Sequence, residues 1–394
     1  MVENGEQPLR VAIIGAGMTG LLIGQGLRKN GYNVTVYEKE AYIGERVREW
    51  TMLIHWALPT LQKTLPDDIL NDMRSAYTDP FYAYDKEKEA LPFYNGNTGE
   101  IAFQVPAIGM RRVSRTRFRR LCTRGLDIRW SKAFKDLQMG ENGPVTIIFE
   151  DGDRAEADFV IGADGTRSKV RRWLVGEEEG KVSASEHAIT NGIVSYNDAE
   201  KARFVRTHPI CALGSSSSGA LFIAVQNVED PEKPETWSFH VCRIFKSKTE
   251  ALEGDEAIAQ MKNMSKDVCE PFRSSIEWTP SGSQCFTTQM NYWITTPWDN
   301  RGSRVTLAGD AAHAMLPARG QGMNHALEDV DKLVAQLVRV KEGMPLQEAL
   351  KTYEDEIFER GPRAVLTSLE DLDNLPKFED PGSIRHQSHG LAKV

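Results

Sequence analysis

The sequence contains no uninterrupted apolar stretch of about 18 residues, the length that a helix needs to span a bilayer. Its first ten residues, MVENGEQPLR, are polar and acidic and do not resemble a signal peptide. Basic residues are not in excess either, because the formal net charge of the 394 residues is −8, which disfavours a nucleic-acid-binding protein. We therefore expect a cytoplasmic protein with no membrane span and no nucleic-acid partner.

Cysteine is also scarce, and the five cysteines are scattered along the chain. Their odd number and the lack of a C-x-x-C pair argue against a disulfide framework and against a zinc site. We expect reduced, mostly buried thiols and no bound metal. The cysteines are Cys122, Cys211, Cys242, Cys269 and Cys285.

With 40% hydrophobic and 26% charged residues, the composition is that of a soluble globular protein. The length suggests two or three folding units, or one large domain with an insertion. At the N-terminus, Leu9–Ile14 has the pattern of a buried strand, Met18–Lys29 that of a helix and Asn33–Tyr37 that of a second strand. This order predicts the βαβ unit of an α/β, Rossmann-like fold.

The rest of the chain alternates between this fold and antiparallel strands. LPFYN and EIAFQVP, separated by GNTGE, predict an antiparallel hairpin that ends at Pro106. Pro144–Phe149 and Ala155–Val160 meet across the turn EDGD, which we interpret as a return to the doubly wound region. Further helices are predicted over Arg111–Leu126, Asp255–Met264, Gly322–Val340 and Pro345–Arg360, and further strands over Gly219–Val225, Thr236–Arg243, Gln284–Tyr292 and Arg304–Leu307.

These patterns divide the chain into two domains and a tail. We expect a discontinuous Rossmann-like domain with C-terminal helices from residues 1–75, 107–180 and 297–370. An inserted, mostly antiparallel β-sheet domain would come from residues 76–106 and 181–296. The charged, proline-containing residues 371–394 predict a flexible tail.

The first motif with chemical meaning is the glycine turn in VAIIGAGMTG. Gly15 permits a tight turn, Gly17 lets the backbone approach a pyrophosphate, and Gly20 lets the helix pack closely on the strand. Glu38, at the end of the second strand, would accept hydrogen bonds from ribose hydroxyls. An ordinary glycine-rich turn is the alternative, but strand, helix and terminal acid together predict a bound dinucleotide, either NAD or FAD.

A second motif, RVTLAGDAAHAMLPARGQGMNHALEDV at residues 304–330, separates these two dinucleotides. A strand leads into Gly309 and Asp310, whose carboxylate can bind a sugar-alcohol hydroxyl. Pro317 to Gly322 predict a rigid, glycine-rich turn whose N–H groups begin the next helix and suit a partly anionic flavin ring. The motif therefore favours FAD.

This segment resembles the GD motif of the single-component (group A) flavin monooxygenases, the family typified by para-hydroxybenzoate hydroxylase and salicylate hydroxylase. The resemblance implies that Asp310 holds the ribitol chain of FAD and that the following turn borders the isoalloxazine ring. Arg319 departs from the family pattern, because many members have glycine there. The form RGQGMNH is similar to fungal members, which implies a fungal enzyme of biosynthesis (secondary metabolism) or catabolism. The predicted turn residues are Pro317, Gly320, Gln321, Gly322, Met323 and Asn324.

A third motif, DFVIGADGTRSKVRR at residues 158–172, resembles the DG motif of the same family. In the family this motif serves both the pyrophosphate of FAD and the reduced nicotinamide. The resemblance therefore implies cofactor-binding roles for Asp164 and Gly165, with Ser168 and Arg171 behind them.

Basic residues add to the predicted FAD site. Arg115 matches an arginine that starts a family helix near FAD, and Arg46 or Arg48 follows Glu38 where the family places a phosphate-binding arginine. The alternative for each of these arginines is a solvent-exposed side chain without a cofactor role. The basic run from Arg111 to Arg124 is either a solvated helix face or a segment from which one arginine turns inward to a cofactor phosphate. Lys39 is a further candidate for the cofactor, and Arg117, Arg119 and Arg120 are predicted to be surface charges.

Three absences narrow the class of flavoprotein. No cysteine precedes Cys122, which excludes the disulfide reductases with their early redox-active pair. A second G-x-G-x-x-G, expected in two-domain Baeyer–Villiger and N-hydroxylating monooxygenases, is missing. Trp293 to Trp298 reads WITTPW, which is not the W-x-W-x-I-P signature of flavin halogenases.

The resemblance also implies a mechanism. NAD(P)H would reduce FAD, the reduced flavin would take up O₂ at its C4a carbon, and the resulting hydroperoxide would transfer one oxygen atom to a small aromatic or polyketide- or terpenoid-like substrate. A phenol or enol would be activated by a base or a hydrogen-bond relay. The candidates, each otherwise a core or surface residue, are His55, His187, His240, Arg243 and Tyr292.

Other residues of these segments have plainer interpretations. His313, inside the second motif, is predicted to be structural and not a proton shuttle. Trp237, Phe239 and Val241 alternate along one strand face, which lines an apolar pocket or belongs to the core.

Two other functions stay open. One is a flavin oxidase or oxidative cyclase on the same scaffold, which uses O₂ without inserting oxygen. The other is a non-catalytic dinucleotide-fold protein of the GDP-dissociation-inhibitor kind, which would keep the first glycine turn without the two later motifs. For the enzyme we expect a small-molecule substrate and O₂ as partners, and a monomer or a homodimer.

Overall fold

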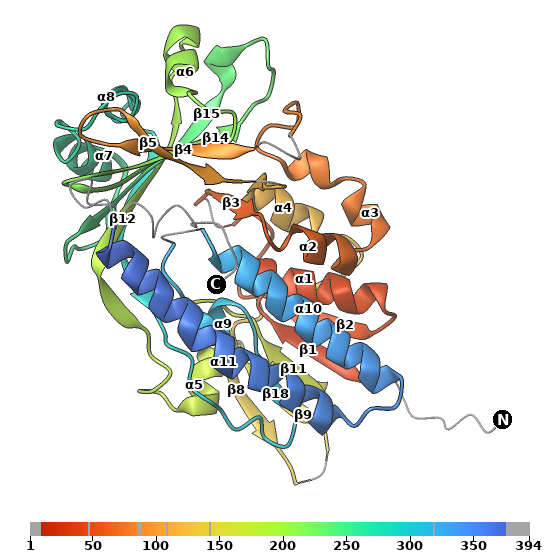
Figure 1. The fold of residues 1–394 in the computed structure, drawn as a ribbon. Coiled ribbons are helices and arrows are strands. Elements are labelled where there is room, and N and C mark those ends of the chain that lie inside the picture. Colours follow the sequence, from red (N-terminus) through yellow and green to blue (C-terminus); the bar gives the residue numbers. More distant parts are fainter. Residues whose placement is uncertain are drawn as a thin grey trace.

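The computed structural model describes residues 9–45, 48–84, 89–107, 109–141, 143–317 and 320–375. A parallel sheet with its helices and a large, mostly antiparallel sheet make up its two main parts (Figure 1). This confirms the predicted Rossmann-like α/β fold with an antiparallel sheet and C-terminal helices.

The parallel sheet has five strands in the order β18-β11-β1-β2-β7, and every neighbouring pair is parallel. Strands β1, β11 and β18 are almost completely buried, because helices and loops cover both faces of the sheet, and apart from Arg10 and Thr306 their residues are apolar or glycine. The strands are β1 (Arg10–Ile14), β2 (Asn33–Tyr37), β7 (Asp127–Arg129), β11 (Phe159–Gly162) and β18 (Val305–Leu307).

Two small antiparallel sheets accompany it. One pairs β3 (Thr51–Ile54) with β6 (Arg111–Ser114). The other has the order β10-β9-β8, formed by β8 (Phe134–Met139), β9 (Val145–Phe149) and β10 (Arg154–Ala157). The hairpin across EDGD is therefore present, but our interpretation that it resumes the doubly wound region is wrong. A tight turn can join only antiparallel strands, so the parallel sheet resumes one strand later, at β11.

The large sheet has eight strands in the order β16-β17-β12-β15-β14-β13-β4-β5. All neighbours are antiparallel except β13 and β4. The hairpin β4–β5 confirms the prediction from LPFYN and EIAFQVP. The strands are β4 (Ala90–Asn95), β5 (Ile101–Pro106), β12 (Ser183–Ser195), β13 (Cys211–Ser216), β14 (Gly219–Asn227), β15 (Ser238–Lys246), β16 (Leu252–Glu253) and β17 (Gln284–Tyr292).

The two faces of the large sheet are both apolar but have different neighbours. One face packs against α6 (Ala199–Val205), α7 (Gly254–Asn263) and α8 (Phe272–Glu277), and it includes Trp237, Phe239 and Val241, which are therefore core residues. The opposite face carries Cys242, Ile244 and Met290, which pack against Leu316 of the second motif. This second face is the one turned toward the parallel-sheet part of the molecule.

Helices complete the α/β part. The long helix α10 (Gly322–Lys341) packs between α1 (Met18–Lys29) and α11 (Leu346–Asp373), as Figure 1 shows. The shorter helices are α2 (Leu58–Thr64), α3 (Asp67–Leu70), η1 (Met73–Ala76), α4 (Arg115–Leu121), α5 (Lys169–Val175) and α9 (Asp310–His313), with η2 (Pro234–Thr236) beside the large sheet.

Several predicted elements have different bounds. The helix predicted from Arg111 begins at Arg115, because the four residues before it pair with β3. The helix predicted to end at Arg360 continues through Pro362 to Asp373, since its apolar stripe stays buried to Leu372. It thus extends three residues into the predicted tail, and residues 376–394 lie outside the described part.

Four of the five cysteines are buried and Cys269 is half-buried, as predicted for thiols of this kind. Within the described ranges, no helix is long and apolar enough to cross a membrane.

Candidate active site

The glycine turn after β1 has the geometry that the sequence predicted. Gly15 has φ +107°, and an added Cβ would lie 2.6 Å from the carbonyl oxygen of Ala163 at the end of β11. A Cβ on Gly20 would lie 2.0 Å from the carbonyl oxygen of Gly15. On Gly17, by contrast, its nearest neighbour would be 3.9 Å away. Gly15 and Gly20 are thus fixed by the protein itself, whereas Gly17 has open space beside it.

The N-terminus of helix α1 is open toward this space. Gly17 caps the helix without a side-chain hydrogen bond, and the first turn contains no acidic residue. The first N–H groups of a helix have no partner inside the helix, and they carry partial positive charge. The helix therefore offers a ready site for a phosphate.

Glu38, at the end of β2, is buried beside the same turn. Its carboxylate accepts a hydrogen bond of 2.6 Å from the N–H of Ala16 and one of 3.0 Å from the N–H of Glu40. Arg119 is held by the turn as well, because its Nε donates to the carbonyl oxygen of Ala16 at 2.7 Å. Its guanidinium lies 2.6 Å from the Glu40 carboxylate and 3.7 Å from that of Glu38.

Our prediction that Arg119 is a surface charge is therefore wrong, because the residue is only 3% exposed. Arg117 is half-buried and donates to Asn227 and to the carbonyl oxygen of Tyr77, so it is not a free surface charge either. Arg120 is exposed as predicted. The sequence did not reveal that Arg119 neutralises Glu38 and Glu40, because helix α4 is far from both residues along the chain.

The other predicted basic residues lie differently. Lys39 is exposed. Arg48 pairs with Glu253 of the large sheet, and its guanidinium carbon is 4.9 Å from the centroid of the Phe286 ring. Arg48 is therefore directed at the large sheet and away from the glycine turn. Arg115 lies over the ring of Trp50 at 4.6 Å, and Arg46 falls outside the described residues.

The DG segment forms the second turn, after β11. The Asp164 carboxylate accepts hydrogen bonds from Ser168 Oγ and from the N–H groups of Lys169 and Val170, so it caps helix α5. Gly165 has φ +83°, and an added Cβ would meet no atom within 4 Å. As at Gly17, the backbone here borders open space.

Arg171 connects the second turn to the third. It is fully buried, and its guanidinium donates to the carbonyl oxygens of Thr166, Gly180 and Ala311 at 2.7 to 3.2 Å. It also lies 4.7 Å from the centroid of the Trp293 ring. Burial lowers the pKa of Arg171 to about 10, so its side chain stays charged at neutral pH.

The third turn follows β18 and contains Gly309 and Asp310. Gly309 has φ +63°, and a Cβ there would lie 2.2 Å from Thr19 Oγ1 of helix α1. The Asp310 side chain is exposed and accepts a hydrogen bond of 3.1 Å from Thr166 Oγ1. Because β18, β11 and β1 are neighbours in one parallel sheet, the three turns meet at the same edge.

The predicted flavin turn leads from this edge to helix α10. Pro317 is exposed, and Gly320 has φ +62° with Leu53 of β3 as its nearest side chain, 3.7 Å from an added Cβ. Gln321 Oε1 accepts a hydrogen bond of 2.6 Å from Trp56 Nε1. Gly322 and Met323, at the start of α10, are half-buried.

Asn324 connects this turn to strand β3. Its Oδ1 accepts a hydrogen bond of 3.0 Å from the N–H of His55, and its Nδ2 donates to the carbonyl oxygen of Leu53, also at 3.0 Å. The side chain is fully buried, so it positions the turn through the backbone of β3. His55 therefore lies beside the turn, with its side chain 5% exposed.

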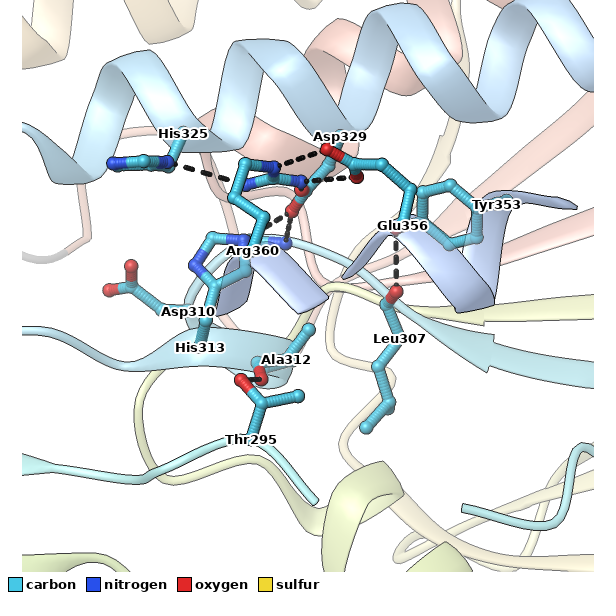
Figure 2. A network of polar contacts seen from close by, with 12 residues as sticks. Thr295, Leu307, Asp310, Ala312, His313, His325, Asp329, Tyr353, Glu356 and Arg360 are labelled. Carbon is cyan, nitrogen blue, oxygen red and sulfur yellow. Dashed lines mark hydrogen bonds and ion pairs between the residues drawn. The ribbon is translucent and has the colours of Figure 1, made fainter. Parts of the chain in front are cut away.

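A buried network of charged residues packs against the third turn (Figure 2). Asp329 of α10 accepts a hydrogen bond of 2.6 Å from the N–H of Gly309, and it lies 2.7 Å from His313 Nε2. Its other oxygen binds Arg360 of α11, which also pairs with Glu356. Burial opposes ionisation of Asp329, but His313 and Arg360 outweigh it and hold the pKa of this carboxyl below its usual range.

Figure 2 also shows that the Asp310 side chain points away from this network, although His313 follows it by only three residues. His313 is fully buried, which agrees with the structural role predicted for it. The short helix α9 thus directs one side chain outward to the sheet edge and another inward to Asp329. We infer that the network fixes the backbone on which Asp310 is presented.

The catalytic candidates on the large sheet divide between its two faces. His240 lies on the face turned toward the α/β part, with Nε2 2.9 Å from Asn191 Oδ1 and Nδ1 3.4 Å from Thr51 Oγ1. Burial, with a smaller contribution from nearby Arg112, lowers the pKa of His240 to about 3, so it is neutral at neutral pH. Tyr292 packs on the same face.

Arg243 lies on the opposite face of the sheet. It is fully buried, and its guanidinium donates to Ser218 Oγ at 2.8 Å and to the carbonyl oxygen of Ser218 at 3.1 Å, next to the end of α7. Side chains alternate between faces along a strand, so Arg243 shares the face of Phe239 and Val241. Its position does not support a role in substrate activation. His187 of β12 pairs with Lys246 at the end of β15, and its Nε2 lies 4.0 Å from Asp373 Oδ1.

Comparisons with known proteins agree with this geometry. The family described as FAD binding domain matches residues 104–368, and that described as NAD(P)-binding Rossmann-like domain matches residues 13–60. The chain is 37% identical to the FAD-dependent monooxygenase phnB of Penicillium herquei, over 91% of this chain and 89% of that protein. The chain belongs to the FAD-dependent monooxygenases.

Other relatives and structures are consistent with this assignment. The FAD-dependent monooxygenase cctM of Talaromyces islandicus is 31% identical over 95% of this chain and 94% of that protein. Among solved structures, Klebsiella pneumoniae HpxO complexed with FAD and uric acid has a TM-score of 0.74 at 19% identity, with 96% of this chain and 92% of that chain covered. A salicylate hydroxylase substrate complex has a TM-score of 0.72 at 18% identity, with 98% and 93% covered, and both structures show that the fold is shared.

The sheet edge of this monooxygenase fits FAD. Gly17 and Gly165 leave room for a ligand to approach the backbone, and the N-terminus of α1 is free to bind a phosphate. Glu38 and Asp310 bring two carboxylates to the same edge, where hydroxyl groups can bind them. The enzyme therefore uses FAD, and FAD monooxygenases take their electrons from NAD(P)H.

Proposed function

We propose that this enzyme uses NAD(P)H and O₂ to insert one oxygen atom into a small aromatic or polyketide- or terpenoid-like substrate. The observation that carries the proposal is the position of the flavin turn. Gly320 borders Leu53, and Leu316 packs against Cys242, Ile244 and Met290 on the inner face of the large sheet. A substrate held between this apolar face and the turn would be shielded from water beside the flavin ring.

The geometry of the edge supports the proposed cofactor roles. The backbone around Gly17 and the first turn of α1 would bind the pyrophosphate, and Glu38 would exchange its bond to Ala16 for bonds to the ribose hydroxyls. Asp310 would hold the ribitol chain, and Asp164 with Gly165 would line the pyrophosphate region. FAD, when bound, supplies the electron transfer that activates O₂.

Residues of the protein would then position the substrate and accept or relay the proton of its hydroxyl group. The apolar inner face excludes water, which suppresses wasteful loss of activated oxygen. His240, neutral and held between Thr51 and Asn191, is suited to relay a proton and not to carry a lasting positive charge. We propose Tyr292 and His55 as the remaining candidates for contact with the substrate hydroxyl.

We further propose that the two sheets correspond to the two predicted domains. Residues 1–75, 107–180 and 297–370 would form the FAD-binding domain, and residues 76–106 and 181–296 the substrate domain. The strands of the parallel sheet all come from the first set, and those of the large sheet all come from the second.

The decisive experiment follows the oxygen atoms. We expect the purified protein to be yellow, and its NAD(P)H oxidation to be stimulated by the right member of a panel of aromatic and polyketide- or terpenoid-like compounds. With ¹⁸O₂, one labelled atom should appear in the product. A product that is oxidised but unlabelled would instead identify a flavin oxidase or oxidative cyclase. A colourless protein that cannot be reconstituted with FAD would contradict any flavin-dependent function.

Replacing Asp310 with alanine tests the proposed ribitol contact. In the free protein this exposed carboxylate accepts only the bond from Thr166 among the described residues, so we expect the stability of the flavin-free protein to be nearly unchanged. Hydrogen bonds to a charged group contribute about 1.5–3 kcal/mol, which predicts FAD affinity at least about tenfold weaker. Flavin fluorescence titration measures it, with Asp299→Ala, a surface residue paired with Arg301, as control. Equal FAD affinity in the two variants would refute the role of Asp310.

A further inference from the structure

Arg112 on strand β6 is a buried cation without an anion. It is 3% exposed, and within the described ranges no aspartate or glutamate lies within ion-pair distance of it. Its Nη2 donates to Thr51 Oγ1, and its Nε is buried without a hydrogen-bond partner. Removing an arginine from water without a counter-ion costs several kcal/mol, so such a group is rarely kept for packing alone.

The position of Arg112 connects it to the proposed substrate region. Arg112 stands directly opposite Leu53 in the β3–β6 ladder, so both side chains lie on the same face of that sheet. Leu53 is the side chain nearest to Gly320 of the flavin turn. The Arg112 guanidinium therefore lies on the wall that borders the turn.

The large sheet provides the opposite wall. The guanidinium carbon of Arg112 lies 4.7 Å from the centroid of the Phe222 ring, and Phe222 packs with Cys242, Met290 and Leu316 on the inner face. His240, which shares Thr51 with Arg112, is neutral and adds no second positive charge. Apolar and neutral polar groups thus surround the guanidinium, which has one unused N–H donor.

From this arrangement we propose that Arg112 binds an anionic oxygen of the substrate, and that the substrate is a mostly apolar, conjugated molecule with one acidic group, a carboxylate or an ionised enol or phenol. The inference rests on the proposed function and specifies its substrate class. The free N–H of Arg112 donates to the oxyanion, whose charge offsets the cost of burying the guanidinium. The apolar remainder of the substrate lies along Phe222 and the inner face.

A calorimetric titration of the FAD-loaded enzyme tests this without any turnover. The probes are two matched pairs: 2-naphthoate with 2-naphthamide for a carboxylate, and 2-hydroxy-1,4-naphthoquinone with its methyl ether for an ionised enol. In at least one pair the anion should bind about tenfold or more tightly than its neutral partner, as a charged hydrogen bond predicts. The pair that shows the preference identifies the acidic group.

Variants assign the preference to Arg112. Arg112→Gln should reduce it to within about twofold, whereas Arg111→Gln should leave it intact, because Arg111 stacks on Tyr84 at 4.2 Å and lies on the other face of the strand. Arg112→Met also tests a purely structural role. If Arg112 serves only to hold Thr51 and Phe222, this variant lowers the melting temperature, but if it is an uncompensated charge the melting temperature stays level or rises.

Equal affinity within both pairs, no saturable binding of any probe, or a preference that survives in Arg112→Gln would overturn the proposal. Such a result in a yellow enzyme that inserts labelled oxygen leaves the proposed function intact. If the protein instead holds no flavin, the proposed function fails, and the same titrations can be read on the flavin-free chain.

Discussion

Replacing Asp329 with alanine is expected to destabilise the protein by about 3–5 kcal/mol, the range for a buried ion pair that loses one partner. Asp329 is fully buried and has three partners, the N–H of Gly309, the imidazole of His313 and the guanidinium of Arg360. The substitution leaves all three without the carboxylate, in a region that water does not reach. Because Gly309 directly precedes Asp310, FAD should be lost as well.

The effect of Asp329→Ala is measured by denaturant unfolding of the flavin-free protein and by FAD titration. A control on the same helix is Asp331→Ala, since Asp331 pairs with Lys63 at the surface and should contribute less than about 1 kcal/mol. Arg360→Lys separates charge from geometry. Lysine keeps the positive charge, but its single ammonium group cannot bind Asp329 and Glu356 together as the guanidinium does. We therefore expect a larger loss in the free energy of FAD binding than in the free energy of unfolding. An Asp329→Ala protein as stable as the Asp331→Ala protein would contradict the assignment.

Acid unfolding gives an independent measurement of the same network. The folded protein holds the pKa of Asp329 below its usual range, near 3.9 in an unfolded chain. The stability from this group is therefore complete above about pH 4–5, and it is lost as the pH falls toward the folded pKa. Asp329→Asn should be less stable at pH 7 and should show a shallower loss of stability below about pH 4. Parallel acid profiles for the two proteins would show that Asp329 is not ionised in the folded state.

The sequence predicted the fold and the location of the cofactor edge because those features depend on residue types at fixed spacing. Gly15 needs a positive φ, Gly20 lies against a backbone oxygen, and both requirements are local. The same holds for the hairpin at GNTGE and for helix α1, whose predicted and observed bounds agree. Glu38 and Asp310 stay predictions as ligands, although the structure brings both to one edge.

Contacts between distant segments could not be predicted in this way. Arg119 looked like one basic residue among many, and only the packing of α4 against the glycine turn brings it to Glu38 and Glu40. Alternation along β15 groups Arg243 with Phe239 and Val241, but only the folded structure shows that this face packs against α7. Asp329 did leave a signal in the sequence, because an acidic residue on the apolar stripe of α10 requires a buried partner.

Substituting alanine at Gly20 and at Gly17 should separate the fold from cofactor binding. A Cβ on Gly20 would lie 2.0 Å from the Gly15 carbonyl oxygen and 3.1 Å from Ile13 Cγ2. Because the first of these is a backbone atom, the clash cannot be relieved by a side-chain rotation, and helix α1 must move away from β1. We expect Gly20→Ala to destabilise the flavin-free protein by about 1–3 kcal/mol and to abolish FAD retention.

Gly17→Ala is the matched variant on the same turn. Gly17 has φ −69° and ψ 178°, which alanine adopts without strain, and the nearest atom to the new Cβ would be 3.9 Å away. The flavin-free protein should therefore unfold at the same denaturant concentration as the wild type. The methyl group would nevertheless occupy the space through which the pyrophosphate reaches the backbone, so FAD affinity should fall about tenfold or more, a difference of about 1.4 kcal/mol.

Gly20→Ala should therefore lose both stability and FAD, whereas Gly17→Ala should lose only FAD affinity, and the two properties are measured separately. Unfolding curves of the flavin-free proteins report the fit of α1 on β1, and FAD titration reports the approach of the ligand. If Gly17→Ala binds FAD as tightly as the wild type, the pyrophosphate does not lie against this turn and the cofactor site must be placed elsewhere along the edge. If Gly20→Ala is as stable as Gly17→Ala, the close approach of helix to strand is relaxed in solution, and Gly20 serves the ligand and not the fold.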